Sequence, residues 1–520
     1  MKESTPISFR IAVIVALGGF IFGFDASVIS GVVGYVTPEF GLNVWQQGLV
    51  VSAPTLAAIF ASLSVVPLSD FVGRKRMLQV VSFLYFVSAI VSAFAPGFWV
   101  LVAARAVGGL AFGSLMITPV YIAEIAPPKQ RGMMVSVNQM NIVIGLSAAY
   151  FSNYLLVQLS QTTAQWVSWT GIDTHTWRWM LSMETLPALA WVILLFLVPE
   201  SPRWLIVKGK EKEARQVFTQ LLPIDQINTC IAEIKKQCAE STRSPFSLLK
   251  ELFHPCMKHV LLIGALVGII QQITGINAVF FFATSIFEQS GVGTDAAFAQ
   301  AVFVGVINVV FTIFAMLLID RLGRKPLMII GLSVIAASMA LTSWGFSSAR
   351  YEITDSNLES LEITTKKELL TPLIGQVFES DVEFKKEITE RIGADAMRTD
   401  GAAILQVTMD INPIVVLTGI LGFVAAFAIS LGPVMWVILS EIFPNHLRGI
   451  AIASIGFINA MTSFAVQFLF PWEIEKLGTG PTFAIYGVFA VIGLILVLRY
   501  LPETKGKTLE QIKKELVPGH

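Results

Sequence analysis

The sequence predicts an all-α integral membrane protein, with twelve transmembrane helices in two pseudo-symmetric six-helix halves and an intracellular helical bundle. Three features support this fold class: an apolar composition, twelve long apolar runs, and three motifs that each occur twice in the same order. Of the 520 residues, 54% are hydrophobic and 14% are charged, whereas a soluble domain has about 25% charged residues. The mean hydropathy of +0.71 agrees with a chain that lies mostly in lipid.

Twelve apolar runs are each long enough to cross a bilayer as a helix. About 20 apolar residues span the hydrocarbon layer, and a helix satisfies all its backbone hydrogen bonds within one segment, as lipid requires. We therefore expect one transmembrane helix for each of the runs 11–33, 48–68, 77–95, 99–122, 134–158, 179–198, 259–287, 298–319, 327–346, 413–438, 450–471 and 481–500.

A polar segment divides these runs into two sets of six. The predicted regions are a six-helix half at 1–198, an intracellular helical linker at 199–256 and a second six-helix half at 257–520. Motifs recur between the halves: "SDFVGRKRML" matches "IDRLGRKPLM", "YIAEIAPPKQRG" matches "ILSEIFPNHLRG", and "PESPRW" matches "PETKGK". Internal repeats with a binding site between them near the membrane midplane are the architecture of secondary transporters.

The distribution of basic residues predicts the orientation. Four short links, "SDFVGRKR", "EIAPPKQRG", "DRLGRKP" and "EIFPNHLRG", contain nine Lys and Arg residues, whereas the alternate links at 34–47, 288–297 and 473–480 contain one. Positive residues remain in the cytoplasm, so both termini and the linker are expected inside. The first residues, "MKESTPISFR", lead into a full-length span without a signal-peptide cleavage pattern, so we expect this segment to be retained.

One polar insertion, at 348–412 between the ninth and tenth runs, has no counterpart in the first half. It is expected on the extracytoplasmic side. Stretches such as "KKELLTPLIGQVF" and "VEFKKEITERIG" favour a small helical cap, while the low apolar content also allows a disordered loop. The sequence leaves both alternatives open.

Several classes of function are excluded by what the chain lacks. The net charge is zero and there is no basic run, so nucleic acid is not an expected partner. There is no phosphate-binding GK[ST] motif, and Cys230, Cys238 and Cys256 lack the spacing of a metal site. We expect no enzymatic activity, no metal and no cofactor, so that any active transport must draw on an ion gradient.

Two buried charges point to coupling with protons. Asp25 lies inside the first run, in "FGFDASVISG", and Arg105 lies inside the fourth. A charge near the bilayer centre costs at least ~2.5 kcal/mol, and two opposite buried charges are best explained by pairing with each other. The alternatives are a purely structural carboxylate at Asp25 and an Arg105 side chain that reaches the outer interface.

The motifs "GRKR" (73–76), "PESPRW" (199–204), "QQITGIN" (271–277), "DRLGRK" (320–325) and "PETKGK" (502–507) together resemble the sugar porter family of the major facilitator superfamily. Within it, the chain is most similar to bacterial proton-coupled xylose and hexose symporters. The resemblance implies alternating access, with Asp25 as the proton site and Arg105 as the partner that governs its protonation. Passive relatives often have Asn in place of this aspartate.

Buried amides suit a sugar, because an uncharged amide both donates to and accepts from hydroxyl groups. "QQITGIN" contributes three amides, and Gly275 within it is expected to permit local bending. Gly432 and Pro433 predict a break in the tenth helix, just before an aromatic residue. The resemblance implies that the sugar site is lined by Phe22, Gln139, Gln271, Gln272, Asn277, Phe281, Asn308, Gly432, Trp436 and Asn459.

The chain departs from the family pattern at this site. Many relatives have a pair of tyrosines where this chain has Phe281 and Phe282, and a tryptophan where it has Ala460. Leu146 stands where the xylose symporter pattern has glutamine. The pocket is therefore expected to be more apolar on one side and roomier on another, and specificity for xylose does not carry over.

The repeated charged motifs resemble the cytoplasmic gates of the family. In the first interpretation, these residues form networks between the halves that hold the inner side closed. In the second, they only anchor the protein at the membrane surface, which accounts for the basic residues but not for the paired glutamates. The gate residues implied by the resemblance are Arg74, Glu124, Arg131, Glu200, Arg203, Arg324, Glu441 and Arg448.

The sequence thus predicts a monosaccharide importer driven by proton symport in a bacterial inner membrane. Its expected partners are a pentose or hexose, protons and the lipid bilayer, and a monomer is the default because one chain forms a complete pathway. A passive facilitator is the first alternative. A transporter-like sugar sensor is less favoured, because only 13 residues follow "PETKGK".

Overall fold

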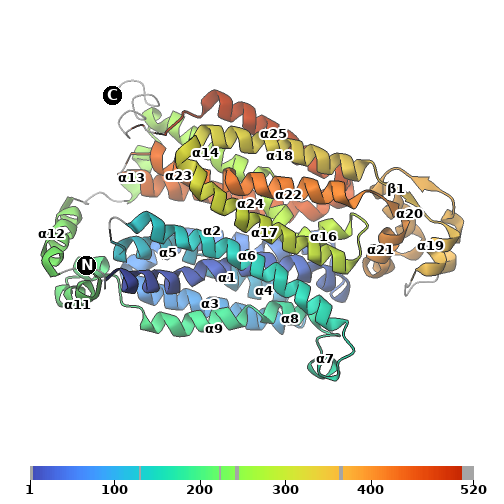
Figure 1. Cartoon of the computed structure of the whole chain (residues 1–520), viewed down its shortest axis with the longest axis horizontal. Coiled ribbons are helices and arrows are strands. Elements are labelled where there is room, and N and C mark those ends of the chain that lie inside the picture. Colours follow the sequence, from blue (N-terminus) through green and yellow to red (C-terminus); the bar gives the residue numbers. More distant parts are fainter. Residues whose placement is uncertain are drawn as a thin grey trace.

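The computed structural model describes residues 4–127, 130–221, 224–240, 245–361, 367–444, 446–505 and 507. Within these residues, twelve segments are helical, long and apolar enough to span a membrane. They coincide with the twelve predicted runs, so the predicted membrane fold is confirmed. Figure 1 shows the spans as two layers, with the helices of the first half in blue to teal below those of the second half in green to red.

In the first half, four spans are continuous and two are broken. The fourth span breaks after Ala111 and the sixth breaks after Ser182. The continuous helices are α1 (Ser4–Glu39), α2 (Val44–Val72), α3 (Arg74–Ala93) and α6 (Arg131–Ser160). The broken spans are α4 (Phe98–Ala111) with α5 (Ser114–Ile125), and α8 (Thr176–Ser182) with α9 (Thr185–Leu194), while a short α7 (Gln165–Thr170) lies in the loop before α8.

In the second half, the seventh and tenth spans are broken, as predicted. Gly275 has a φ of +91°, a left-handed conformation that favours glycine, and begins a new helix there. The tenth span breaks at Ser430, just before Gly432. The helices are α14 (Lys258–Ile273), α15 (Ile276–Phe281), α16 (Ala283–Glu288), α17 (Thr294–Leu322), α18 (Arg324–Ser347), α22 (Pro413–Ile429), α23 (Leu431–Ile442), α24 (Arg448–Leu477) and α25 (Thr479–Tyr500).

The linker is helical, as predicted, and consists of α10 (Pro202–Val207), α11 (Glu211–Leu221), α12 (Ile224–Glu240) and α13 (Pro245–Leu252). The first three pack through one apolar cluster that includes Leu205, Phe218 and Ile231. Figure 1 places α11, α12 and the N-terminus at one end of the bundle, which we call the linker end.

The insertion folds into a small domain at the opposite end, which we call the cap (residues 349–411) and the cap end. It contains α19 (Asp355–Ser360), α20 (Asp381–Ile392), α21 (Ala394–Thr408) and three strands, β1 (Arg350–Glu352), β2 (Val377–Phe378) and β3 (Met409–Asp410). The strands form an antiparallel sheet in the order β2-β1-β3.

The cap has its own apolar core. The rings of Tyr351 and Phe384 stack with 5.2 Å between centroids, and Leu370, Ile388 and Ile404 are fully buried beside them. The disordered-loop alternative is therefore wrong for the described residues, and the helical-cap prediction was incomplete because it lacked the sheet. Residues 362–366 lie outside the described part of the chain.

The cap is attached to the second half by hydrogen bonds. Asp381 of α20 accepts from the backbone N–H and the hydroxyl of Thr479, both at 3.1 Å, and the Thr479 hydroxyl also lies 2.7 Å from Gln289. Helix α21 contacts α1 of the first half. The cap therefore touches both halves.

The two halves meet mainly through α2 with α24 and α6 with α17 (Figure 1). Glycine permits the close approach: a side chain at Gly48 would meet the backbone carbonyl of Phe468, and one at Gly305 would meet Ser147. Further contacts join Tyr150 to the Phe280 carbonyl, at 2.6 Å. These contacts lie in the parts of the helices nearest the cap end, so the halves are packed together on that side.

Candidate functional site

Asp25 and Arg105 form a buried ion pair, as predicted. Asp25 and Arg105 are each only 2% exposed. Arg105 Nη1 donates hydrogen bonds to Asp25 Oδ1 and to the backbone carbonyl of Asp25, the second at 3.3 Å. The alternative in which Arg105 reaches the outer interface is therefore wrong. Asp25 lies at the middle of α1, and α4 holds Arg105 opposite it.

A third charged group, which the sequence analysis missed, completes this cluster. Glu184 is buried at the break between α8 and α9 and interacts electrostatically with both Asp25 and Arg105. The oxygens Asp25 Oδ2 and Glu184 Oε1 accept no hydrogen bond from a donor among the described residues, and the two carboxyl groups lie close enough to share a hydrogen bond with each other. The signal was available in the sequence, because "LSMETLPAL" places a carboxylate within the sixth apolar run.

The amides of the second half form one hydrogen-bonded cluster. Asn459 Nδ2 donates to Gln271 Oε1 at 2.8 Å, Gln272 Nε2 donates to Asn459 Oδ1 at 3.2 Å, and Asn277 Nδ2 donates to Gln272 Oε1 at 2.8 Å. The break at Gly275 allows this arrangement, because it turns Asn277 back toward Gln272 across the discontinuity.

Gln271 also supports the break in the tenth span. Its Nε2 donates to the carbonyls of Leu431 and Gly432, at 3.1 and 3.3 Å. These two carbonyls belong to the first turn of α23, so Gln271 attaches the start of the second segment of the tenth span to α14. The predicted role of Gly432 is thus partly structural, since it is the Gly432 backbone that contacts the amide cluster.

The other predicted sugar-site residues differ in exposure. Trp436 is 38% exposed on α23, and Gln139 is exposed on α6, so both are accessible. Phe22 packs edge-to-face on Phe112 at 4.6 Å. Phe281 and Asn308 are buried, in α15 and α17. The structure therefore brings Gln271, Gln272, Asn277 and Asn459 together and leaves Gln139 and Trp436 open to an approaching molecule.

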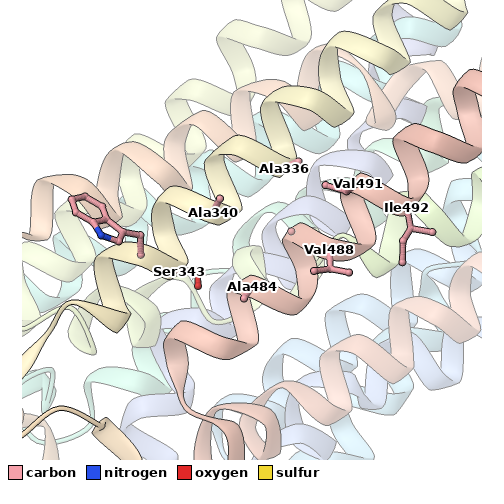
Figure 2. A pocket seen from close by; sticks show the side chains of 9 residues that line it. Ala336, Ala340, Ser343, Ala484, Val488, Val491 and Ile492 are labelled. Atoms are coloured by element: carbon pink, nitrogen blue, oxygen red, sulfur yellow. The ribbon is translucent and has the colours of Figure 1, made fainter.

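A groove of about 450 Å³ elsewhere in the molecule does not belong to this site. Figure 2 shows it between α18 and α25, lined by residues such as Ala336, Ala340, Ala484 and Val488. Val488 and Ile492 of this groove are exposed on the outside of the bundle. Its apolar lining and its position are those of a surface that contacts lipid.

The repeated charged motifs at the linker end fold into the same geometry in each half. In the first half, Arg74 pairs with Glu124 at 3.4 Å, and the Lys75 N–H donates to Glu200 at 3.0 Å. In the second half, Arg324 pairs with Glu441 at 2.9 Å, and the Lys325 N–H donates to Glu503 at 3.0 Å. The sequence analysis missed Glu503, although "PETKGK" contains it at the position of Glu200.

Two further contacts complete the repeat. Ser201 and Thr504 each donate a hydroxyl hydrogen bond to the glutamate of their own half, Glu124 and Glu441. A glycine with positive φ, Gly73 at +114° and Gly323 at +97°, forms the turn beside the acidic side chain. The duplication predicted from the motifs therefore extends to individual hydrogen bonds.

These ion pairs join helices within one half, whereas the gate interpretation expected networks between the halves. Arg203 is exposed and Arg448 is half-buried; the described part of the chain shows no ion pair for either. The side chain of Arg131 lies outside the described residues. In this conformation the motifs stabilise each half separately, and their role as gates between the halves stays a prediction.

Comparison with known proteins agrees with this fold. The family model for "Sugar (and other) transporter" matches residues 11–357 and 396–516, which leaves most of the cap outside it. The chain is 34% identical to the arabinose-proton symporter of Bacillus subtilis, over 96% of this chain and 92% of the relative. It is 31% identical to the D-xylose-proton symporter of Escherichia coli, over 97% and 95% of the two chains.

Solved structures extend this similarity to three dimensions. The inward-open xylose transporter XylE from E. coli superimposes with a TM-score of 0.73 at 28% identity, covering 98% of this chain and all of XylE. XylE bound to 6-bromo-6-deoxy-D-glucose gives 0.69 at 30% identity, covering 99% and 100% of the two chains. The fold, the duplicated motifs and these similarities identify the chain as a member of the sugar porter family of the major facilitator superfamily.

Proposed function

We propose that this protein imports a monosaccharide together with a proton, with Asp25, Arg105 and Glu184 holding the proton and the amide cluster binding the sugar. The single observation that carries the proposal is the buried cluster of two carboxyl groups around one guanidinium. Relatives named as arabinose-proton and D-xylose-proton symporters support the same function.

The composition of the charged cluster favours a bound proton. Arg105 can neutralise one carboxylate, and an additional unneutralised negative charge is strongly disfavoured in a low-dielectric interior. Asp25 and Glu184 are both buried beside it, so we expect the pair to share a proton until one of them contacts water. Release of that proton strengthens the electrostatic attraction between the carboxyl groups and Arg105, and rebinding of the proton weakens this attraction.

The position of the cluster connects protonation to helix packing. Gly108 and Gly109 follow Arg105 on α4, and a side chain at Gly109 would collide with Pro54 of α2. Since α2 makes one of the main contacts with the second half, movement of Arg105 can be passed from α4 to α2. This is how protonation would favour one arrangement of the halves over the other.

The amide cluster suits a neutral polyhydroxylated ligand. Gln272, Asn277 and Asn459 bring donors and acceptors from three helices, α14, α15 and α24, to one place, without a net charge that would have to be desolvated. Exposed Trp436 offers an apolar face for the C–H groups of a sugar ring. Pentoses and hexoses both fit this chemistry, and we propose a monosaccharide without choosing between them.

We place the protein in the bacterial plasma membrane as a multi-pass monomer with both termini in the cytoplasm. The excess of basic residues in the links at the linker end supports this orientation. The cap end then faces outward, and the packing of the halves on that side corresponds to an inward-facing state. One proton that crosses 100 mV supplies ~2.3 kcal/mol, enough for roughly fifty-fold accumulation of a neutral sugar.

The test uses purified protein in liposomes with an imposed inside-alkaline pH gradient. Radiolabelled D-xylose, L-arabinose and D-glucose are supplied in turn, with wild type and Asp25→Asn in parallel. We expect wild type to accumulate one of the sugars above equilibrium. Asp25→Asn should lose accumulation and keep exchange of that sugar between the two sides of the membrane.

A matched control replaces another acidic residue that can titrate. Burial raises the pKa of Glu288, which lies outside the spanning segments, to about 7. Glu288→Gln should retain accumulation. If wild type merely equilibrates every sugar, the protein is a facilitator and Asp25 is a structural partner of Arg105; if Glu288→Gln alone abolishes accumulation, the proton site has been misassigned.

A further inference from the structure

A polar contact joins the two halves next to the amide cluster. Thr55 of α2 donates a hydrogen bond from its hydroxyl to Gln467 Oε1 of α24, at 2.9 Å. Both residues are buried, and Gln467 is completely enclosed. The neighbouring contacts between these helices are apolar or aromatic, such as Trp45 with Phe468, whose ring centroids are 5.5 Å apart.

This contact is connected to the proposed sugar site by an unbroken series of hydrogen bonds. Gln467 Nε2 donates to Ser463 Oγ at 2.8 Å, and Asn277 Nδ2 donates to the same oxygen at 2.6 Å. Asn277 Nδ2 also donates to Gln272 Oε1 at 2.8 Å. The series therefore runs from Gln272 through Asn277, Ser463 and Gln467 to Thr55, and so from one half to the other.

The amide nitrogen of Asn277 is fully used in this series. The two hydrogens of Asn277 Nδ2 go to Gln272 and Ser463, and the Gln467 amide uses its oxygen for Thr55 and its nitrogen for Ser463. A sugar oxygen that accepts a hydrogen bond from Asn277 Nδ2 must therefore displace one of its two bonds. The change reaches Ser463 first and Gln467 next, because a buried amide left without a partner is costly.

Thr55 also lies beside the helix that carries Arg105. Its neighbour Pro54 packs directly against Gly109 of α4. The Thr55–Gln467 bond is thus the point where a polar route from the amide cluster reaches the part of the first half that packs on the charged cluster. When the halves separate on the cap side, this bond has to break, since its two members belong to different halves.

We propose that Thr55 and Gln467 are a positioning pair that couples the state of the amide cluster to closure of the two halves on the cap side. With the bond formed, the closed cap side is stabilised; loss of the bond favours the arrangement that is open on that side. The coupling to sugar rests on the amide cluster being the sugar site, whereas the effect of the bond on closure does not.

The experiment measures how accessible the closed interface is from the cap side. Ser52, a fully buried residue of α2 one turn before Thr55, is replaced by cysteine, and a membrane-impermeant maleimide is added outside intact cells. The native cysteines lie in and just after the linker, at the opposite end. Labelling rates are compared for Thr55→Val, Gln467→Leu, the double variant, and Thr55→Ser.

We expect Thr55→Val and Gln467→Leu each to raise the labelling rate about three- to tenfold, as the loss of one buried hydrogen bond predicts. Thr55→Ser, which keeps the hydroxyl, should label at the wild-type rate. The double variant should be no more accessible than the single ones, because both remove the same bond. Thr482→Val is the matched control: Thr482 is also fully buried, but its hydroxyl bonds the Gly478 carbonyl of its own helical turn.

Labelling is then repeated with D-xylose, L-arabinose and D-glucose. One sugar should change the labelling rate of the Ser52→Cys protein by some factor. In the protein that also carries Thr55→Val, the same sugar should change the labelling rate by a factor at least threefold smaller. The proposal is overturned if Thr55→Val labels no faster than Thr482→Val, or if the effects in the double variant multiply. If Thr55→Val and Gln467→Leu label faster without sugar but Gln272→Ala binds sugar as wild type does, the Thr55–Gln467 bond stabilises the closed cap side and the amide cluster is not the sugar site.

Discussion

The two six-helix halves are alike at the linker end and different at their centres. Each half contains the same three contacts. An arginine pairs with a glutamate, the backbone N–H of the residue after the arginine donates to a second glutamate, and a hydroxyl group donates to the first glutamate. At mid-membrane, the first half buries Asp25, Arg105 and Glu184, whereas the second buries the amide cluster.

This difference separates two kinds of chemistry. A proton site needs carboxyl groups whose charge can be compensated, and such groups are tolerated in a membrane core only when paired. A sugar site needs several donors and acceptors without net charge. Placing the two in different halves means that each can be altered separately, and that their coupling must cross the interface between the halves.

The largest effect is expected from removal of the cation in the first half. Arg105→Met leaves Asp25 and Glu184 without a positive partner, and breaking one side of a buried pair costs about 3–5 kcal/mol. We expect accumulation to fall to equilibrium, a loss of up to about fifty-fold, together with a lower melting temperature of the purified protein. Liposome uptake and thermal unfolding in the same detergent measure these effects.

A double variant distinguishes the electrostatic cause from damaged packing. Arg105→Met combined with Asp25→Asn removes both members of the ion pair, so thermal stability should recover most of its loss while accumulation stays absent. Equal instability of the single and double variants would show that the shape of Arg105, and not its charge, is required.

A smaller effect is expected in the second half, where one amide can be removed without exposing a charge. Gln272→Ala removes one donor and one acceptor from the cluster, worth about 1–1.5 kcal/mol. The sugar concentration at half-maximal uptake should rise about tenfold, with no change in the dependence on the pH gradient. Concentration series of the accumulated sugar, with and without the gradient, measure both quantities.

Gln161→Ala is the matched control for that measurement. Gln161 has the same amide group, which donates to Asp295 of the second half at 2.6 Å, but it lies in an exposed position near the cap end and away from the amide cluster. Half-maximal uptake should be unchanged in this variant. A loss of gradient dependence in Gln272→Ala would contradict the division of roles between the halves.

The spans could be predicted because each is a long apolar run, and the ion pair because two buried charges in lipid require each other. The breaks at Gly275 and before Gly432 followed from residues that interrupt helices. The duplicated motifs predicted a duplicated six-helix unit, and the matching contacts of Arg74 and Arg324 agree with that duplication.

Other features could not be predicted from patterns. Thr55 and Gln467 are 412 positions apart, and their contact depends on how two helices cross. The cap strands are two or three residues long, too short for an alternating pattern to show. The arrangement of the ion pairs at the linker end within each half depends on which conformation the chain adopts, and composition does not determine this.

The smallest effect is expected where the halves are alike. Glu124→Gln and Glu441→Gln each remove the charge from one largely enclosed pair at a helix end, but the new amide oxygen can still accept the hydrogen bonds that the carboxylate accepts. The side chains of Arg74 and Arg324 have similar exposure, so both substitutions should slow uptake by a similar factor, no more than about fivefold. Initial uptake rates at saturating sugar provide the measurement, and combining the two substitutions should multiply the effects, since each pair belongs to its own half. A much larger effect in the double variant would instead mean that the motifs also contact each other across the interface in the opposite conformation, and would restore the gate interpretation.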